Sequence, residues 1–136
     1  MKKICAGILC LHPTSRRVLL GLRSDCKEWS TFGGHFEESD SNVKNTAIRE
    51  LKEETLCNVP YKISKEPIYI FKNNFLIYYN FLSIFDKMFE PKIDKKHYEY
   101  SWFKIDCLPE NILPGCKEMF NKQMPLLNRI CDFNKR

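Results

Sequence analysis

The segment FGGHFEESDSNVKNTAIRELKEET, residues 32–55, constrains the fold of this 136-residue chain more than any other. Two glycines predict a tight turn, and the residues after them have helical character from Ser41, a plausible N-cap, to about Thr55. Pro60 lies beyond the far end, where it cannot extend the helix. The apolar positions of this helix, which fall on one sector, are Ala47, Ile48 and Leu51. The segment therefore predicts a helix that buries one flank.

Three carboxylates of this helix, those of Glu50, Glu53 and Glu54, share a sector of roughly 100° beside the apolar one. An ordinary solvated face would explain a charge run, since like charges repel by only a few tenths of a kcal/mol per exposed pair. Here the acids adjoin the apolar positions and follow a glycine turn, where backbone carbonyls can approach a ligand. Hard oxygen ligands suit Mg²⁺ or Mn²⁺, so we expect a metal site. Arg49, one turn before Glu53, can pair with that carboxylate and orient it.

Strand-like segments surround this helix and predict an α/β fold with a mixed sheet between helices. We expect a hairpin near the start, a short strand that ends on the glycines, two long strands with a turn at 72–74, a late strand and a terminal helix. The corresponding segments are Ile4–Leu11 with Arg17–Arg23, residues 29–34, residues 61–85, residues 98–105, and Cys116–Cys131. The length suits one domain over residues 1–136.

The composition, with 29% charged and 43% hydrophobic residues, is that of a folded soluble protein. A net charge of +5 fits a phosphate-bearing partner and equally a solvated basic surface, and no arginine-rich tract points to duplex nucleic acid. Seven cysteines with no C-x-x-C pair argue against a disulfide framework or a zinc ribbon, so we expect reduced, mostly buried thiols.

The apolar run near the N-terminus is short and stops at His12 and Pro13, so we interpret it as a first strand rather than a signal peptide. No segment approaches the roughly 20 apolar residues that cross a bilayer. We expect a cytoplasmic protein with no membrane partner.

The residues GGHFEESDSNVKNTAIRELKEET resemble the Nudix box, in which a glycine, an acid and an Arg-Glu-aliphatic-x-Glu-Glu core are regularly spaced. Gly34 matches the glycine, Asp40 the first acid, and residues 49–54 the core. The flanking VLLGLRS and HYEYSWFKIDCLP are similar to strands of the family, so the resemblance covers most of the chain.

The chain departs from the Nudix pattern at three positions. Eight residues separate Asp40 from Arg49 where the box has seven, Asp40 stands in place of the usual Glu, and Leu56 replaces a glycine. We expect the helix to end on Asn58 as the left-handed cap. The role of Asp40 stays open.

The resemblance implies a Nudix-type α/β/α sandwich and Mg²⁺- or Mn²⁺-dependent hydrolysis of nucleoside diphosphate-X compounds by metal-activated water. Glu50, Glu53 and Glu54 would hold the metal together with a carbonyl of Gly34, and Glu50 is a candidate base. The interpretation that we prefer is a MutT-like enzyme whose substrate is a small nucleotide such as a (d)NTP. Alternatives are a dinucleoside polyphosphate, ADP-ribose, a nucleotide sugar, an RNA cap or 5′ end, or a catalytically weak nucleotide-binding module. A homodimer is kept as an alternative assembly.

Many members of the family add a glutamate from the loop before the late strand, where this chain aligns Lys96. Glu99 and Asp94 are nearby acids, and we select Glu99 as catalytic, although it is equally well explained as an exposed strand residue. His97, in the same loop, has substrate contact and solvent exposure as open alternatives.

Four residues are candidates for substrate binding: Arg23, Phe32, Gly33 and His35. Arg23 resembles an arginine that faces phosphate in the family. Among aromatic residues able to stack on a base, Trp29, Tyr79 and Phe81 more often belong to a core, and Phe32 is the one kept as a substrate contact.

Overall fold

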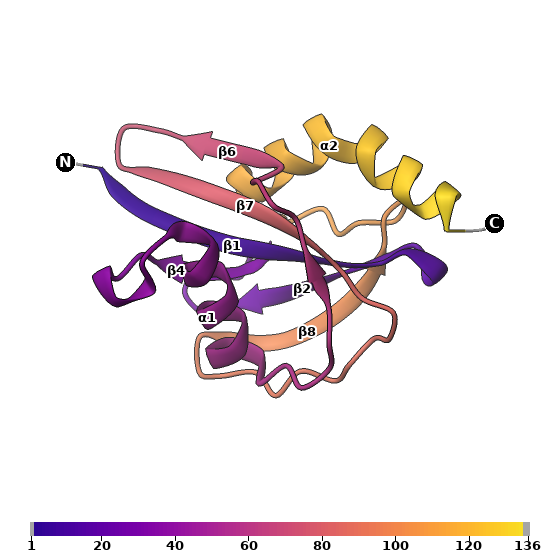
Figure 1. Cartoon of the computed structure of the whole chain (residues 1–136), viewed down its shortest axis with the longest axis horizontal. Helices are drawn as coiled ribbons and strands as arrows, with labels where there is room; N and C mark the ends of the chain where they lie inside the picture. The colour runs from indigo at the N-terminus through magenta and orange to yellow at the C-terminus, as the bar shows by residue number, and fades with distance from the viewer. Residues whose placement is uncertain (1, 135–136) are drawn as a thin grey trace.

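The computed structural model describes residues 2–134, in which a mixed eight-stranded sheet lies between two helices (Figure 1). The strands are β1 (Lys3–His12), β2 (Arg17–Arg23), β3 (Trp29–Ser30), β4 (Phe32–His35), β5 (Lys62–Ile63), β6 (Tyr69–Lys72), β7 (Leu76–Ile84) and β8 (His97–Lys104). The α-helices are α1 (Val43–Thr55) and α2 (Pro114–Phe133), and the short 3₁₀ turns are η1 (Pro13–Ser15) and η2 (Glu38–Asp40). The predicted α/β/α sandwich with a mixed sheet is confirmed.

Strand β1 organises the sheet, and its pairing positions the site. Strand β7 pairs parallel with β1 from Lys3 to Leu11 and occupies one of the two edges of β1. The other edge is shared: β4 pairs antiparallel with residues 5–8, and β2 pairs antiparallel with residues 10–12. Strand β8 continues the sheet beyond β2. Because β2 and β4 share one edge of β1, they diverge, and the sheet is split there.

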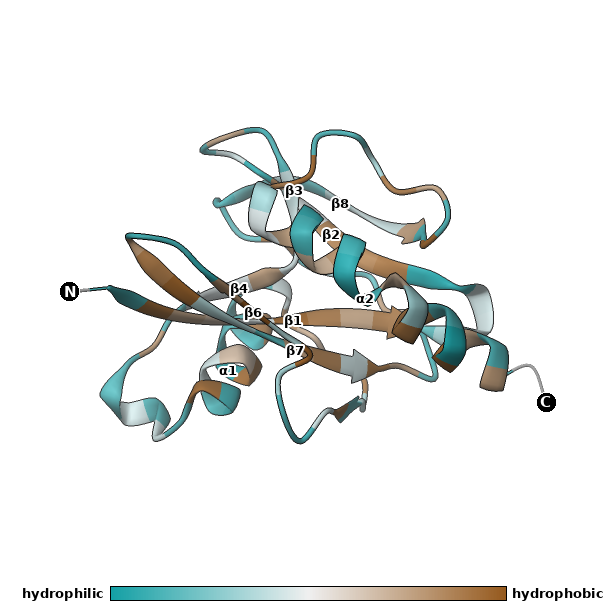
Figure 2. Ribbon diagram, turned by 90° about the horizontal axis from the view of Figure 1, so that it is seen from above, coloured by the Kyte–Doolittle hydropathy of each residue, from teal (hydrophilic) through white to brown (hydrophobic). Residues whose placement is uncertain are grey.

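The two faces of the sheet carry separate cores, because alternate strand residues point to opposite faces. The core on the α1 side includes Ala6, Ile8, Leu19, Phe32, Ala47, Leu51, Phe81 and Phe85. The core on the α2 side includes Leu9, Leu11, Val18, Leu20, Trp29, Leu82, Met119, Phe120 and Leu127. Figure 2 shows hydrophobic stretches of β1 and β2 in the middle of the molecule and hydrophilic segments in the outer loops.

Most predicted elements are confirmed with shifted ends, but the first of the two long strands predicted over residues 61–85 is wrong, because that stretch forms the short strands β5 and β6. The tight turn predicted at Gly33 and Gly34 is also wrong, because both lie within β4 and neither has a positive φ. Strands β1 and β2 form the expected hairpin, and β6 and β7 form the second one around the turn at 72–74. The short strand predicted at 29–34 divides into β3 and β4, and the last helix runs from Pro114 rather than Cys116. Five of the seven thiols are buried and no disulfide joins any of them within the described residues, as expected. Neither helix of residues 2–134 is long and apolar enough to span a bilayer.

Both predicted caps of α1 are wrong by a small shift. The N-cap is Asn42, whose side chain accepts a hydrogen bond from the Asn45 amide at 2.8 Å. Ser41 instead ends η2 with φ of 70°, so the extra residue of this segment is absorbed in the turn before the helix. At the other end Leu56, rather than Asn58, takes the left-handed conformation with φ of 52°, because the chain turns directly after Thr55.

Candidate active site

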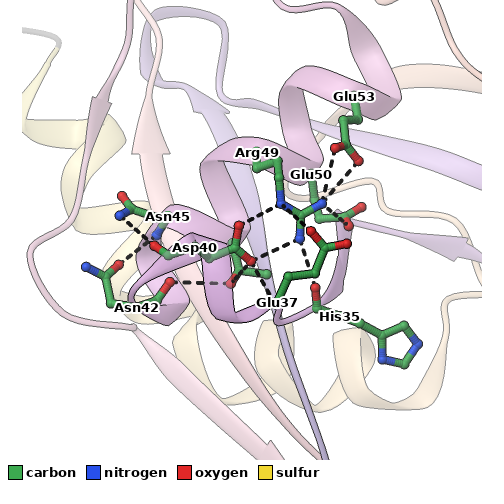
Figure 3. Close-up of polar contacts among 9 residues, drawn as sticks. His35, Glu37, Asp40, Asn42, Asn45, Arg49, Glu50 and Glu53 are labelled. Atoms are coloured by element: carbon green, nitrogen blue, oxygen red, sulfur yellow. Dashed lines mark hydrogen bonds and ion pairs between the residues drawn. The ribbon is translucent and has the colours of Figure 1, made fainter.

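Asp40 and Arg49 form the frame of the site (Figure 3). The Nε of Arg49 donates to Asp40 at 2.7 Å and a terminal nitrogen donates to the second carboxylate oxygen at 3.0 Å. Asp40 is buried and also accepts from the Thr46 hydroxyl and the Glu37 amide, at 2.8 and 2.9 Å. The hydrogen bonds from Arg49 hold the pKa of Asp40 well below its usual range. Despite the extra residue and the shorter side chain, Asp40 is therefore an orienting partner of Arg49.

Arg49 extends this frame to the carboxylates of α1. One terminal nitrogen donates to Glu50 at 3.0 Å and to Glu53 at 3.2 Å, and the other donates to the His35 carbonyl at 2.9 Å. The predicted pairing of Arg49 with Glu53 is confirmed. Glu53 itself is more than half exposed, whereas Glu50 is buried. The arginine thus fixes α1 against the end of β4.

Glu50 lies directly against the backbone of Gly34. A Cβ added at Gly34 would lie 2.5 Å from the carboxyl carbon of Glu50, so a side chain there would displace this carboxylate from its observed position. One oxygen of Glu50 is bound by Arg49, and the other is buried without a hydrogen-bond partner in residues 2–134. A buried carboxylate oxygen without a partner is costly. A divalent cation, which prefers oxygen ligands, fits this position.

Glu54 is the second buried acid of the helix, with 3% of its surface exposed. The Gly33 amide donates to its carboxylate at 2.9 Å. Its pKa is raised to about 8, mainly by burial and then by the charges of Glu50 and Asp94, while Lys96 and the Gly33 amide act in the opposite direction. Glu54 and Glu50 therefore lie close enough for their charges to repel each other. Two carboxylates that share one cation would repel each other in this way when the cation is absent.

Asp94 and His97 join Glu54 at the split in the sheet. One ligand atom from each of these three residues lies within 4.8 Å of the other two, so they could hold a metal ion. His97 is buried, its Nδ1 lies 3.0 Å from an oxygen of Asp94, and its ring packs against Phe32 at 4.8 Å between centroids. The sequence signal for this group was an acid and a histidine, Asp94 and His97, three residues apart where a late strand begins.

The choice of Glu99 as the additional acid is corrected by the strand register. Glu99 is exposed and pairs with Leu22, whose side chain packs on the α2 side of the sheet. Paired residues share a face, so Glu99 lies on the opposite face from His97 and Phe32. Asp94, the acid that was not selected, is the one brought to Glu54.

The choice of Phe32 as a substrate contact is also wrong. Its side chain is 1% exposed and fills the core on the α1 side, because strand alternation turns it inward. Of the other substrate candidates, Gly33 donates its amide hydrogen to Glu54, and the carbonyl of the exposed His35 accepts a hydrogen bond from Arg49. Arg23 forms a two-point ion pair with Asp25, at 3.0 and 2.8 Å.

A cavity of about 250 Å³ opens on the α2 side of the sheet, behind Gly33. A side chain at Gly33 would collide with the buried hydroxyl of Tyr78, which lines this cavity. Gly33 therefore stands between the cavity and Glu54. The lining is mostly apolar and comprises Arg23, Ser30, Thr31, Phe71, Asn73, Leu76, Tyr78, Asn80 and residues 113–116.

A family model described as the NUDIX domain matches residues 1–123. The chain belongs to the Nudix family. No match was found among curated protein sequences.

Solved structures show the same fold at low sequence identity. An Ap4A hydrolase from C. elegans superposes with a TM-score of 0.78 at 16% identity, over 90% of this chain and 97% of its own. A NUDIX-family hydrolase from Clostridium perfringens gives 0.74 at 16% identity, over 93% and 99%. The E. coli dihydroneopterin triphosphate pyrophosphohydrolase gives 0.71 at 15% identity, over 90% and 96%.

Proposed function

We propose that this Nudix protein hydrolyses nucleoside diphosphate-X compounds with the help of Mg²⁺ or Mn²⁺. The observation that carries this proposal is the pair of buried carboxylates, Glu50 with an unpartnered oxygen and Glu54 with a pKa near 8. Two such groups are costly to keep together in a folded protein unless a cation binds between them. Perturbed acids of this kind concentrate at functional sites.

The residues of the site would have different roles in this reaction. Glu50 and Glu54 would hold the cation, with Glu53 and the Gly34 carbonyl as further candidate ligands. When bound, the cation would neutralise the diphosphate and lower the pKa of a water molecule. Arg49 binds one oxygen of Glu50, and the other, unpartnered oxygen would either hold the cation or accept a proton from the attacking water. The exposed side chain of Glu53 is open to solvent and substrate.

The cavity behind Gly33 supports a small nucleotide, with a (d)NTP as first choice. Its volume of about 250 Å³ falls below the roughly 300–1,000 Å³ of pockets for drug-sized ligands, which suits one nucleoside group. Arg23 lines the cavity, and its backbone pairs with His97 of the acidic group, so it lies where phosphates would connect the two. His35 is a second candidate for phosphate contact.

Other substrates of the family remain alternatives for the assay. The structural neighbours include proteins named for Ap4A and dihydroneopterin triphosphate, so this fold accommodates different groups. A dinucleoside polyphosphate, ADP-ribose, a nucleotide sugar and an RNA 5′ end therefore belong in the panel. A nucleotide-binding module without turnover is the alternative from a different class.

The test is turnover of that panel with Mg²⁺ or Mn²⁺, beside Glu54→Gln and the matched control Glu110→Gln, which changes an exposed loop residue. We expect metal-dependent release of phosphate or pyrophosphate products, about 10²–10³-fold slower in Glu54→Gln and unchanged in Glu110→Gln. Nucleotide binding without turnover on any substrate would contradict the enzymatic function.

A further inference from the structure

His97, the first residue of β8, has an unusual environment for a histidine at the start of a strand. Its side chain is 4% exposed, and the Phe32 ring covers it. Nδ1 faces Asp94 at 3.0 Å, and the other ring nitrogen has no hydrogen-bond partner in the described part of the chain. One side of this ring is therefore held, and the other is available.

His97 belongs to the group that contains Glu54 and Asp94. The histidine, Glu54 and Asp94 each place a ligand atom within 4.8 Å of the others. A histidine that binds a metal commonly donates its second N–H to a carboxylate, which fixes the ring. The Asp94–His97 contact has this form. Glu50, with its unpartnered oxygen, completes the acidic surroundings.

We infer that His97 is a nitrogen ligand of the divalent cation, held in place by Asp94, and that this site prefers Mn²⁺ to Mg²⁺. The inference rests on the proposed function in its use of that cation. Mg²⁺ favours oxygen ligands in regular octahedra, whereas imidazole favours transition metals. His97 would thereby add a nitrogen ligand to a site predicted from carboxylates and the Gly34 carbonyl.

Pulsed EPR of Mn²⁺ bound to the full chain tests this assignment directly. A ligating imidazole gives a ¹⁴N coupling on the manganese signal, and we expect it in the wild-type protein. The chain has three histidines, so His97→Gln is compared with His12→Gln and His35→Gln. The coupling should disappear only in His97→Gln, in which Mn²⁺ affinity should fall by about 10-fold or more while Mg²⁺ affinity changes less.

A second measurement avoids any effect of substitution on folding. Wild-type protein grown with ¹⁵N-histidine should show the ¹⁵N coupling in place of the ¹⁴N coupling. Bound Mn²⁺ without histidine coupling, or coupling that persists in His97→Gln, would overturn the inference while turnover could still establish the enzyme. Coupling in the wild-type protein without turnover of any nucleotide would instead overturn the proposed function alone.

Discussion

Helices α1 and α2 cover opposite faces of the same sheet but bury different chemistry (Figure 1). The buried residues of α2 are Cys116, Met119, Phe120, Leu127 and Cys131, all of them apolar or thiol side chains. Helix α1 buries Ala47 and Leu51 together with Glu50 and Glu54. Burial of apolar surface stabilises a fold, whereas burial of a carboxylate without compensation opposes it. The difference indicates that α2 contributes stability and that α1 gives up stability for a function.

The largest change in the free energy of unfolding should come from substituting one buried residue in each helix, with opposite signs for α2 and α1. Met119 of α2 is fully buried, so Met119→Ala should reduce the free energy of unfolding by about 2–5 kcal/mol. Glu54→Gln removes a buried acid while keeping its shape, so the metal-free protein should gain stability at pH 8. Denaturant unfolding with a chelator present measures both. Equal losses in the two variants would contradict the division between the helices.

The stability of the metal-free protein should also depend on pH through Glu54. The pKa of a glutamate in the unfolded chain is 4.5, and in the folded protein burial raises it to about 8. Between these values the folded protein keeps a proton that the unfolded chain has released, so the free energy of unfolding falls as pH rises. We expect a loss of a few kcal/mol from pH 5 to pH 8 in excess of that in Glu54→Gln. Parallel pH profiles for the two proteins would rule out this titration.

The smallest effect concerns the end of α1. Leu56 is 53% exposed and holds a left-handed conformation that costs a side-chain-bearing residue roughly 1–2 kcal/mol. Leu56→Gly should therefore stabilise the protein by about 1 kcal/mol in thermal or urea unfolding. The matched control Leu56→Ala removes the same contacts but keeps Cβ, so it should bring no gain. A gain of the same size in both variants would place the effect elsewhere.

Local patterns in the sequence predicted most strands, both helices and the carboxylates, because alternation and helical spacing act over short distances. The pairing of Arg49 with Glu53 follows from one helical turn in the same way. The faces of Phe32 and Glu99 depend on strand register, which residues distant in sequence determine. The meeting of Asp94 and His97 with Glu54 depends on the split between β2 and β4, which no local pattern records.

The most direct test of the account is the free energy of unfolding of wild type and Glu54→Gln at pH 7.5, each with a chelator and with saturating Mn²⁺. Without the cation, Glu54→Gln should be the more stable protein. With Mn²⁺, a ligand that binds only the folded state, the wild-type protein should gain stability and the variant should gain little, so the order reverses. Equal gains in both proteins, or a more stable wild type in chelator, would contradict the claim that α1 buries these carboxylates for a cation.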